Sequence, residues 1–486
     1  MSLPAAQAEV GALLARLAGA APVETHVSAV YVGQEDAWKM KKAVALGFLD
    51  FTSLAERERL LRRELALNAP FAPCLYREVV PITRCEDGAL ALGGPGDPVE
   101  WVLRMAPLPP GDILGAQAAG AFDAARLDAL ADAVFAMHTA LPPQAAPGFR
   151  TVIEGNGRAA LAAGLPAGRV AAWEAAALAA LVRLEPWLAA RAGEGRVRRC
   201  HGDLHLGNLC LWQGRVTPFD ALEFDEALAT IDTGYDLAFL LMDCEHRLGR
   251  AAANRVLNRY VARSGDAGLV AGLPLWLSLR ALIRAHVEAK RGGDGLAYLD
   301  RAEALLRPVP PRLVAVGGLM GTGKTRLARA LAPALGPAPG ALVLRSDEIR
   351  KRLAGVLPEQ RLPPSAYTPE AGAAVFSELT AGARAALRAG HAVIADAAFL
   401  RPLERDAIEA AAAGARFDGI WLAAPRAVLE ARIAARTGDA SDADAAVLAA
   451  AAARDAGPVA WQVLDATLDP LPAARVALGC NGADPC

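Results

Sequence analysis

The sequence predicts two folded parts, an α+β domain with a strand-rich and a helical lobe, followed by an α/β domain built on a parallel sheet. The chain has 486 residues, more than one hydrophobic core usually supports. Short apolar runs alternate regularly with helical stretches only after position 312, which is the rhythm of a parallel sheet. The proline-rich segment Arg307-Pro-Val-Pro-Pro-Arg312 separates the two patterns and favours an extended connector.

Composition narrows the class of partner. The 51 basic and 53 acidic residues give a formal net charge of −2. A chain with this balance has no positive electrostatic field that would attract it to nucleic acid or to an anionic membrane. No charge-free run reaches the roughly 18 strongly apolar residues of a membrane span, and Glu9 and Arg16 interrupt any signal-peptide core. We therefore expect a cytoplasmic protein with small-molecule partners, no membrane and no nucleic acid. The oligomeric state is left open.

The first part covers residues 1–306. Residues 25–105 alternate apolar and polar in short stretches, such as 27–32 and 100–105, around one helical segment at 54–68. Helical periodicity dominates from 127 to 306, interrupted at 200–225 by short apolar runs and turn residues that predict a hairpin, 211–217, and a loop. This pattern predicts a small lobe at about 1–105, a helical lobe at about 106–306 and a linker at 307–312.

The second part is predicted to be a parallel sheet flanked by helices, spanning 313–479 before a tail at 480–486. Its strands are read from four apolar runs, at 313–316, 341–344, 391–394 and 419–422.

The first chemical motif is His201-Gly-Asp-Leu-His-Leu-Gly-Asn208, followed by Asp220 after the predicted hairpin. Phosphoryl transfer from ATP is mostly positioning and charge neutralisation, and it needs a carboxylate near the acceptor hydroxyl and oxygen ligands for Mg²⁺. Asp203, Asn208 and Asp220 are the right chemical types. The alternative is a turn that bonds only to itself.

This pattern resembles the aminoglycoside phosphotransferase and protein-kinase-like superfamily. The resemblance implies that Asp203 is the catalytic base and that Asn208 and Asp220 hold the metal. The sequence departs from the protein-kinase pattern because no glycine-rich loop precedes the motif, and because Asp220 is followed by Ala221 rather than by Phe-Gly. Glu223 is either an added acidic ligand or a solvated side chain.

Ala37-Trp38-Lys39 resembles the strand whose lysine meets the α- and β-phosphates of ATP in that superfamily. Lys41 shares the same strand face two residues later, so either lysine fits, and Ala37 favours Lys39. The partner of this lysine is expected to be a helical glutamate, and Glu64 is the preferred candidate. The alternative for all three is an ordinary solvated face.

The second motif, Gly318-Leu-Met-Gly-Thr-Gly-Lys-Thr325, follows an apolar strand and opens an apolar-periodic helix, which is the context of a phosphate-binding P-loop. Backbone N–H groups and the helix N-terminus cradle the phosphates, Lys324 neutralises the β- and γ-phosphates, and Thr325 ligates Mg²⁺. The residues expected to contact the nucleotide are Gly318, Gly321, Thr322, Gly323, Lys324 and Thr325.

Two further acids follow predicted strands. Asp347 comes after the second strand, and Arg350 lies three residues later, so Asp347 can deprotonate an acceptor hydroxyl while Arg350 holds the substrate. The spacing resembles small-molecule, polynucleotide and zeta-toxin-like P-loop kinases; the alternative is a helix N-terminal acid with an exposed arginine. Val393-Ile-Ala-Asp396 resembles a Walker B strand end, which makes Asp396 a candidate to hold Mg²⁺ through water.

Arg432 and Arg436 lie four apart on a predicted helix before a loop at 438–444. They resemble the lid arginines of nucleoside-monophosphate-kinase-like folds, which close over the transferring phosphate. Arg436 is the preferred candidate because it is nearer the loop, and a surface pair is the alternative.

Over nearly its whole length the chain resembles an uncharacterised bacterial family that fuses an aminoglycoside-phosphotransferase-like domain to a P-loop kinase domain. This implies a bifunctional ATP- and Mg²⁺-dependent kinase acting on small-molecule hydroxyls, with consecutive steps on one metabolite as one option. Alternatively, one domain is an ATP sensor for the other, or the second domain is zeta-toxin-like or a nucleic-acid 5′-hydroxyl kinase. Asp203 and Asp347 favour the enzyme, and the lack of basic excess counts against a nucleic-acid substrate. The choice between ATP and GTP stays open.

Overall fold

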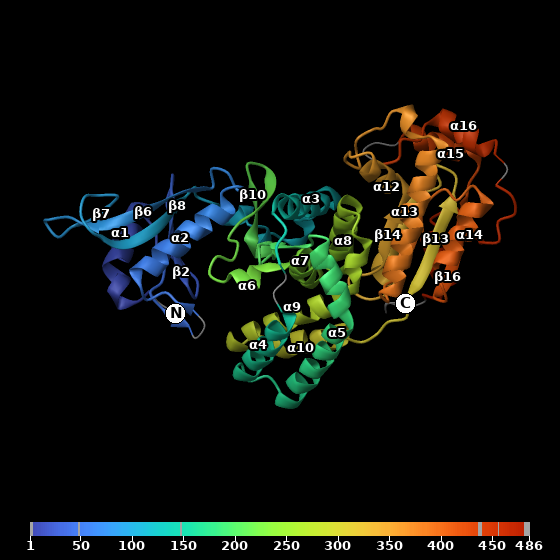
Figure 1. Ribbon diagram of the computed structural model, residues 1–486. Coiled ribbons are helices and arrows are strands. Elements are labelled where there is room, and N and C mark those ends of the chain that lie inside the picture. The colour runs from blue at the N-terminus through green and yellow to red at the C-terminus, as the bar shows by residue number, and fades with distance from the viewer. Residues whose placement is uncertain (1–2, 47–48, 146–147, 436–439, 455, 481–486) are drawn as a thin grey trace. The chain divides into compact units, whose positions relative to one another are not determined.

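The computed structural model describes the chain except for residues 1–2, 47–48, 146–147, 436–439, 455 and 481–486 (Figure 1). The chain divides into two compact units. The first contains Met1–Ala121, Ala136–Pro147 and Arg191–Asp236, and the second contains Phe122–Phe135, Gly148–Ala190 and Leu237–Cys486. Much of the predicted helical lobe thus groups with the C-terminal residues, and the domain boundaries drawn from the sequence stay a prediction. Among the described helices, none is long and apolar enough to cross a membrane.

The first unit holds an antiparallel six-stranded sheet of order β1-β2-β3-β8-β6-β7. Helix α1 (Ala8–Ala18) packs on one face, and α2 (Leu54–Asn68), which forms where the sequence predicts a helix, packs on the other. Ser53 caps α2 by accepting a hydrogen bond from the backbone N–H of Glu56. The strands are β1 (Val23–Glu24), β2 (Ser28–Val32), β3 (Ala37–Lys41), β6 (Tyr76–Arg84), β7 (Leu90–Leu92) and β8 (Pro98–Met105), and a separate pair is β4 (Ala45–Leu46) with β5 (Leu49–Asp50).

Strand β3 sends alternate side chains to the two faces of this sheet. Trp38 and Met40 join the core under α1, while Ala37 joins the core under α2. Because side chains alternate along a strand, Lys39 and Lys41 point with Ala37 toward α2. Both lysines are buried.

A compact segment of the first unit carries the first motif. Strand β9 (Val197–Arg199) pairs with β12 (Thr230–Asp232), and β10 (Leu209–Trp212) forms a hairpin with β11 (Arg215–Pro218), in agreement with the predicted hairpin. The short helix α6 (Glu226–Ala229) leads into β12. A buried ion pair braces the base of the segment, with Arg191 Nε 2.6 Å from Asp232 Oδ2.

The helical part of the chain consists of α3 (Ala124–Ala140), α4 (Phe149–Ala162), α5 (Ala167–Gly193), α7 (Thr233–Leu248), α8 (Arg250–Ser264), α9 (Leu273–Lys290) and α10 (Gly295–Leu305). Within the second unit, Trp173 Nε1 donates to Ser278 Oγ at 2.8 Å, and both side chains are buried. This bond joins α5 to α9.

The C-terminal part is a parallel five-stranded sheet of order β14-β15-β13-β16-β17, of which Figure 1 labels β14, β13 and β16. Its strands are β13 (Arg312–Gly318), β14 (Leu342–Arg345), β15 (Val393–Asp396), β16 (Arg416–Ala423) and β17 (Gln462–Asp465). The first four form where the sequence predicts strands, and β17 is a fifth that the apolar pattern did not indicate. Helices α11 (Lys324–Leu331) and α17 (Leu471–Leu478) share a core with one face, while α13 (Pro369–Arg388) and α14 (Pro402–Ala411) lie on the other.

Three further helices surround the carboxyl edge of this sheet: α12 (Ser346–Leu353), α15 (Arg426–Ala434) and α16 (Ala445–Ala452). In a parallel α/β sheet, ligands bind at this edge, where the strands end. The P-loop and both predicted acids of the second part therefore lie at one end of one sheet.

Candidate active sites

Five charged side chains meet in the first unit. Lys39 Nζ lies 2.6 Å from Glu64 Oε1 and 2.5 Å from Asp220 Oδ1. Lys41 Nζ lies 2.7 Å from Glu64 Oε2 and 2.5 Å from Glu223 Oε1. Glu64, fully buried, thus binds both lysines that the sequence left as alternatives. Glu223 is buried as well, so it belongs to the cluster rather than to a solvated face.

These pairs shift the ionisation of the cluster. Burial lowers the pKa of Lys39, but the carboxylates of Asp220 and Glu64 outweigh it and hold that pKa well above its usual value. The pKa of Lys41 is raised in the same way, mainly by Glu64 and then by Glu223, against the effect of burial. Burial raises the pKa of Asp220, yet Lys39 and Lys41 lower it to about 2. A carboxylate that stays ionised across the physiological range suits a metal ligand.

Two side chains that the sequence did not single out fix the backbone around Asp220. Asp220 has a φ of 59°, a left-handed conformation that Asp tolerates better than most residues. Its N–H donates to Tyr76 Oη at 2.9 Å, and the N–H of Ala221 donates to Asn68 Oδ1 at 2.9 Å. Asn68 lies four positions after Glu64, so helical spacing offers a signal for its place on the same face.

The loop after β9 brings Asp203 and Asn208 together. Asn208 Nδ2 donates to the backbone oxygen of Asp203 at 2.9 Å and to its Oδ2 at 3.0 Å. The Asp203 side chain is 43% exposed, which leaves it accessible to an acceptor. Asp236 is fully buried and accepts the N–H groups of His201 at 3.1 Å and Gly202 at 2.9 Å. The start of the loop is therefore anchored by a buried carboxylate.

His201 connects this loop to the hairpin. Its ring Nε2 lies 2.9 Å from the carbonyl oxygen of Phe219, the residue before Asp220. Burial lowers the pKa of His201, although Asp236 acts in the opposite direction, so a neutral ring with Nε2–H donating is favoured. The acid, the amide and the metal-type aspartate of the first motif are thus held by one connected set of hydrogen bonds.

The P-loop in the second unit has the backbone that phosphate binding requires. Gly318, Gly321 and Gly323 all have positive φ, and a Cβ on Gly318 would lie 2.4 Å from the carbonyl oxygen of Leu422. Lys324 Nζ donates to the carbonyl oxygen of Gly318 at 2.9 Å and also to that of the next residue. The lysine ammonium is therefore directed onto the loop. Thr322 Oγ1 closes the turn by donating to the oxygen of residue 319 at 2.8 Å.

The metal-type residues of the second site are in direct contact. Thr325 Oγ1 donates to Asp396 Oδ2 at 2.6 Å, and Arg345 Nε lies 3.4 Å from the same oxygen. Burial raises the pKa of Asp396 despite the opposing charges of Arg345 and Lys324. A hydroxyl beside a carboxylate is an oxygen donor set that fits Mg²⁺, and a bound cation would favour the ionised form of Asp396.

The predicted acceptor-side residues lie on α12. Asp347 is half-buried in the first turn of the helix, immediately after β14. Arg350 Nη1 donates to the carbonyl oxygen of Ala366 at 3.2 Å, and its guanidinium lies 4.9 Å from the centre of the Tyr367 ring. Arg350 is therefore in contact with the segment that follows α12.

Two contacts that the sequence did not indicate join α12 and the segment after it to the predicted lid loop. Lys351 Nζ lies 2.5 Å from Asp442 Oδ2, and Tyr367 Oη donates to the same oxygen at 2.6 Å. Of the two lid arginines, Arg432 is exposed and its Nη1 lies 3.5 Å from the carbonyl oxygen of Gly321 in the P-loop. Arg436, the preferred candidate, lies outside the described residues.

Two family models match the chain. Residues 48–280 match the model of the phosphotransferase enzyme family, and residues 313–458 match that of an AAA domain. The predicted combination of an aminoglycoside-phosphotransferase-like domain with a P-loop kinase-like domain is thereby confirmed, as is the mixed fold class.

Curated relatives match most of this chain. The chain is 30% identical, over 462 residues and 89% of both chains, to uncharacterized proteins of Mycobacterium tuberculosis and Mycobacterium bovis. Solved structures give lower similarity: a choline/ethanolamine kinase family protein from Mesorhizobium loti is 15% identical, covers 62% of this chain and 95% of its own, and has a TM-score of 0.39. A sugar kinase from Janibacter is 22% identical, covers 35% of this chain and 96% of its own, and has a TM-score of 0.29.

Proposed function

This chain belongs to the family that it shares with the uncharacterized mycobacterial proteins, and from its matched domains and the geometry of its two sites we propose that it is an ATP-dependent kinase with two transfer sites. The coarser property, a kinase-type phosphotransferase, follows from its domains. The observation that carries the proposal is that each phosphate-binding lysine comes with an accessible acid on the acceptor side. Asp203 serves this role in the first site, and Asp347 serves it in the second.

In the first site, Asp203 accepts the proton of the acceptor hydroxyl, because it is the exposed carboxylate of the 201–208 loop. Lys39, held against Glu64 at 2.6 Å, binds the α- and β-phosphates. Asn208 and Asp220 are the residues that would hold Mg²⁺, which supplies charge neutralisation at the phosphates. Asp220 contacts Lys39 at 2.5 Å, so the lysine lies beside the oxygen that would ligate the metal.

In the second site, the P-loop N–H groups and Lys324 bind the phosphates, and Thr325 and Asp396 are the residues that would hold Mg²⁺. Asp347 orients or deprotonates the second acceptor hydroxyl. Arg350 binds the acceptor, and Arg432 and Arg436 close over the transferring phosphate. The support is the 2.6 Å contact between Thr325 and Asp396 and the place of Asp347 after β14.

The substrates proposed are small molecules with hydroxyl groups, with consecutive phosphorylation of one metabolite as the specific form. The test is a screen of a bacterial metabolite pool for ATP-dependent mass gains of one or two phosphates. It compares the intact protein with the Asp203→Ala and Lys324→Ala variants. Independent acceptors predict two gains, each lost in one variant, whereas consecutive steps predict that one variant loses both gains and the other loses only the gain of two phosphates. A gain that depends on a single site would make the other domain a nucleotide-binding regulator, and no gain at all would contradict the kinase proposal.

A further inference from the structure

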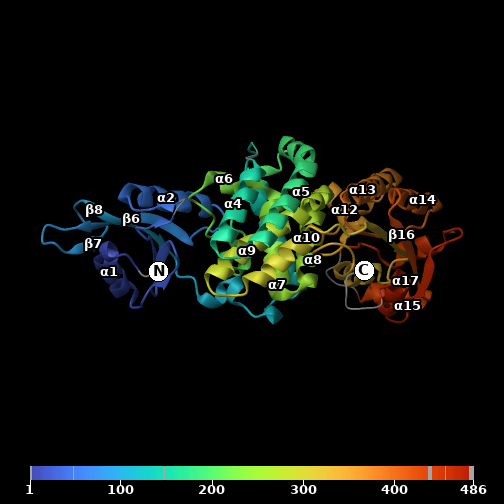
Figure 2. The same cartoon turned by 90° about the horizontal axis from the view of Figure 1, so that it is seen from below.

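Helix α8 lies along an edge of the P-loop sheet. Strand β14 is at the end of the sheet order and pairs only with β15 among the described strands. Both α8 and β14 belong to the second unit. Figure 1 shows α8 beside β14, and Figures 1 and 2 both show α8 near α12, which it contacts. An edge strand presents unpaired N–H and C=O groups on its open side, and burying them requires partners.

Two asparagines of α8 supply these partners. The N–H of Val343 donates to Asn258 Oδ1 at 2.6 Å. The carbonyl oxygen of Ala341 accepts from Asn254 Nδ2 at 3.0 Å and from Asn258 Nδ2 at 3.2 Å. Asn258 Nδ2 also donates to Asn254 Oδ1 at 3.0 Å, which fixes the two amides relative to each other. The side-chain amides thus make the pattern of bonds that a neighbouring strand would make.

The contact is buried and therefore sensitive to loss of its polar partners. Ala341 is fully buried, Val343 is 7% exposed and Asn254 is 3% exposed. A buried backbone group left without a partner costs more free energy than the bond itself contributes in water.

Two arginines of α8, Arg250 and Arg259, make further contacts on either side of the asparagines. Arg250 Nη2 donates to the carbonyl oxygen of Gly336 at 2.6 Å, ahead of β14. Arg259 Nη1 lies 2.6 Å from Glu359 Oε1, beyond the end of α12, and Nη2 of the same guanidinium lies 2.6 Å from Asp132 Oδ2. Helix α8 therefore contacts the segment from β14 through α12 at three places: before the strand, along the strand and after α12.

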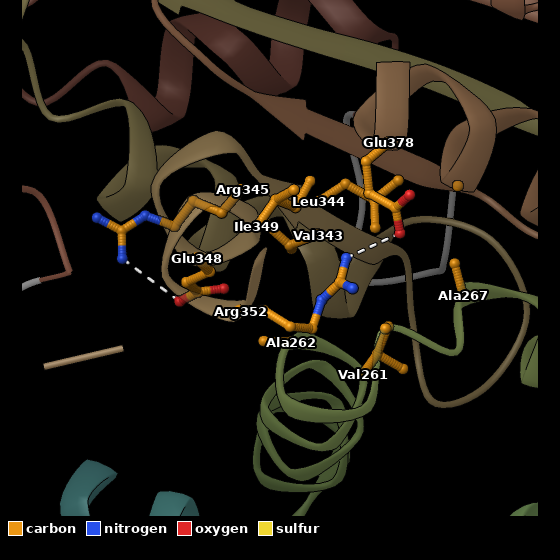
Figure 3. A pocket seen from close by; sticks show the side chains of 12 residues that line it. Val261, Ala262, Ala267, Val343, Leu344, Arg345, Glu348, Ile349, Arg352 and Glu378 are labelled. Atoms are coloured by element: carbon orange, nitrogen blue, oxygen red, sulfur yellow. Dashed lines mark hydrogen bonds and ion pairs between the residues drawn. The ribbon is translucent and has the colours of Figure 1, made fainter. Parts of the chain in front are cut away.

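Figure 3 shows the contact between α8 and α12, where a narrow pocket opens. Val261 and Ala262 of α8 face Ile349 and Arg352 of α12. Arg352 Nη2 is anchored on the other side by Glu378 Oε1 at 2.9 Å. A side chain at Gly265, the residue after α8, would come within 2.5 Å of the Arg352 guanidinium, so glycine permits this close packing.

The strand that α8 holds leads directly into the acceptor side of the second site. Strand β14 ends at Arg345, which contacts Asp396, and α12 follows with Asp347 and Arg350. We propose that Asn254 and Asn258 are positioning residues of the second transfer site, setting the place of Asp347 through β14. This inference rests on the proposed role of Asp347. It makes the second site dependent on a helix that precedes the P-loop by more than 50 positions.

The test uses the full chain carrying Asp203→Ala, so that only the second site turns over. The double change Asn254→Leu with Asn258→Leu keeps side-chain size and removes all the amide bonds to β14. Hydrogen exchange of peptides covering 342–353 is expected to accelerate about tenfold or more, since the exchange of an amide follows the opening of its hydrogen bond. ADP release in the presence of MgATP and a metabolite pool is expected to fall about tenfold in kcat, with KM for ATP within about twofold because the P-loop is untouched.

Arg255→Met is the matched control, because Arg255 lies on α8 but pairs with Asp128 rather than with the sheet. It should leave the 342–353 exchange and the kcat unchanged. Unchanged exchange and turnover in the double variant would overturn the inference, as would acceleration spread evenly over all peptides of the second unit. Lys324→Ala in the same background separates the two proposals: if ADP release survives it, the second transfer site itself is wrong, whatever the asparagines do.

Discussion

Glu64→Gln tests the charge cluster of the first site with the smallest change in shape. The two carboxylate oxygens of Glu64 bind Lys39 at 2.6 Å and Lys41 at 2.7 Å. Glutamine keeps one oxygen, now neutral, and turns the other contact into an amide NH₂ against an ammonium group. Among the described residues, Lys39 then retains Asp220 alone as an ionic partner, so the lysine is drawn toward the carboxylate proposed to hold the metal.

The magnitude follows from the two bonds. A hydrogen bond to a charged group contributes about 1.5–3 kcal/mol, and one is lost while the other is weakened. A total near 3 kcal/mol corresponds to roughly a 100-fold fall in kcat/KM for ATP. Because the cluster is buried, solvent and salt screen this loss only slightly. The effect should be confined to the first site.

The assay is ADP release with MgATP and a metabolite pool, in a Lys324→Ala background that silences the second site. Glu58→Gln is the matched control on the same helix. Its partner Arg62 lies at 2.8 Å and is 55% exposed, so this pair contributes little. If kcat/KM for ATP falls no further in Glu64→Gln than in Glu58→Gln, the cluster has no part in binding ATP and the reasoning is refuted.

Three further outcomes are expected. Gly318→Ala should disable the second site and lower the Tm, because its Cβ would lie 2.4 Å from the oxygen of Leu422; thermal melts against Gly372→Ala, whose Cβ meets nothing within 4 Å, check this. Burial lowers the pKa of His391 to about 4, so the unfolded chain binds more protons between about pH 6.5 and 4, and stability falls as the pH drops through that window. In urea unfolding, the free energy of unfolding should fall by about 3 kcal/mol by the acid end of that window. The His391→Gln variant should lose most of this pH dependence. EDTA should stop ADP release at both sites and added Mg²⁺ should restore it, whereas release that persists in EDTA would exclude the proposed metal roles.

Much of the fold was predictable because the deciding signals are local. The helix at 54–68 has an N-capping serine and an apolar stripe, and three strands of the P-loop sheet, β13, β14 and β15, are buried and mostly apolar. Strand β17 gave no such signal because three of its four residues are exposed. Its place at the far edge of the sheet comes from pairing with β16, which is a tertiary contact.

In the candidate sites, too, some residues are indicated by local motifs and others are brought together only by tertiary contacts. Motif spacing indicates Asp203 and Lys324, but it cannot choose between Lys39 and Lys41, because strand alternation gives both the same face. In the structure both lysines bind the same partner, Glu64. Lys351 and Asp442, separated by 91 positions, meet only through the tertiary fold. No local pattern indicates such a pair, and none indicates the hydrogen bonds between the asparagines of α8 and the edge of the sheet at β14.

The most direct test of two independent transfer sites is ADP release by four proteins: the parent, Asp203→Ala, Lys324→Ala and the double variant. Each is assayed with MgATP and the same metabolite pool. Two sites predict that each single variant loses one product and keeps the other, and that the double variant loses both. If neither single change alters the products or the rate of ADP release, the chain does not work through these two sites.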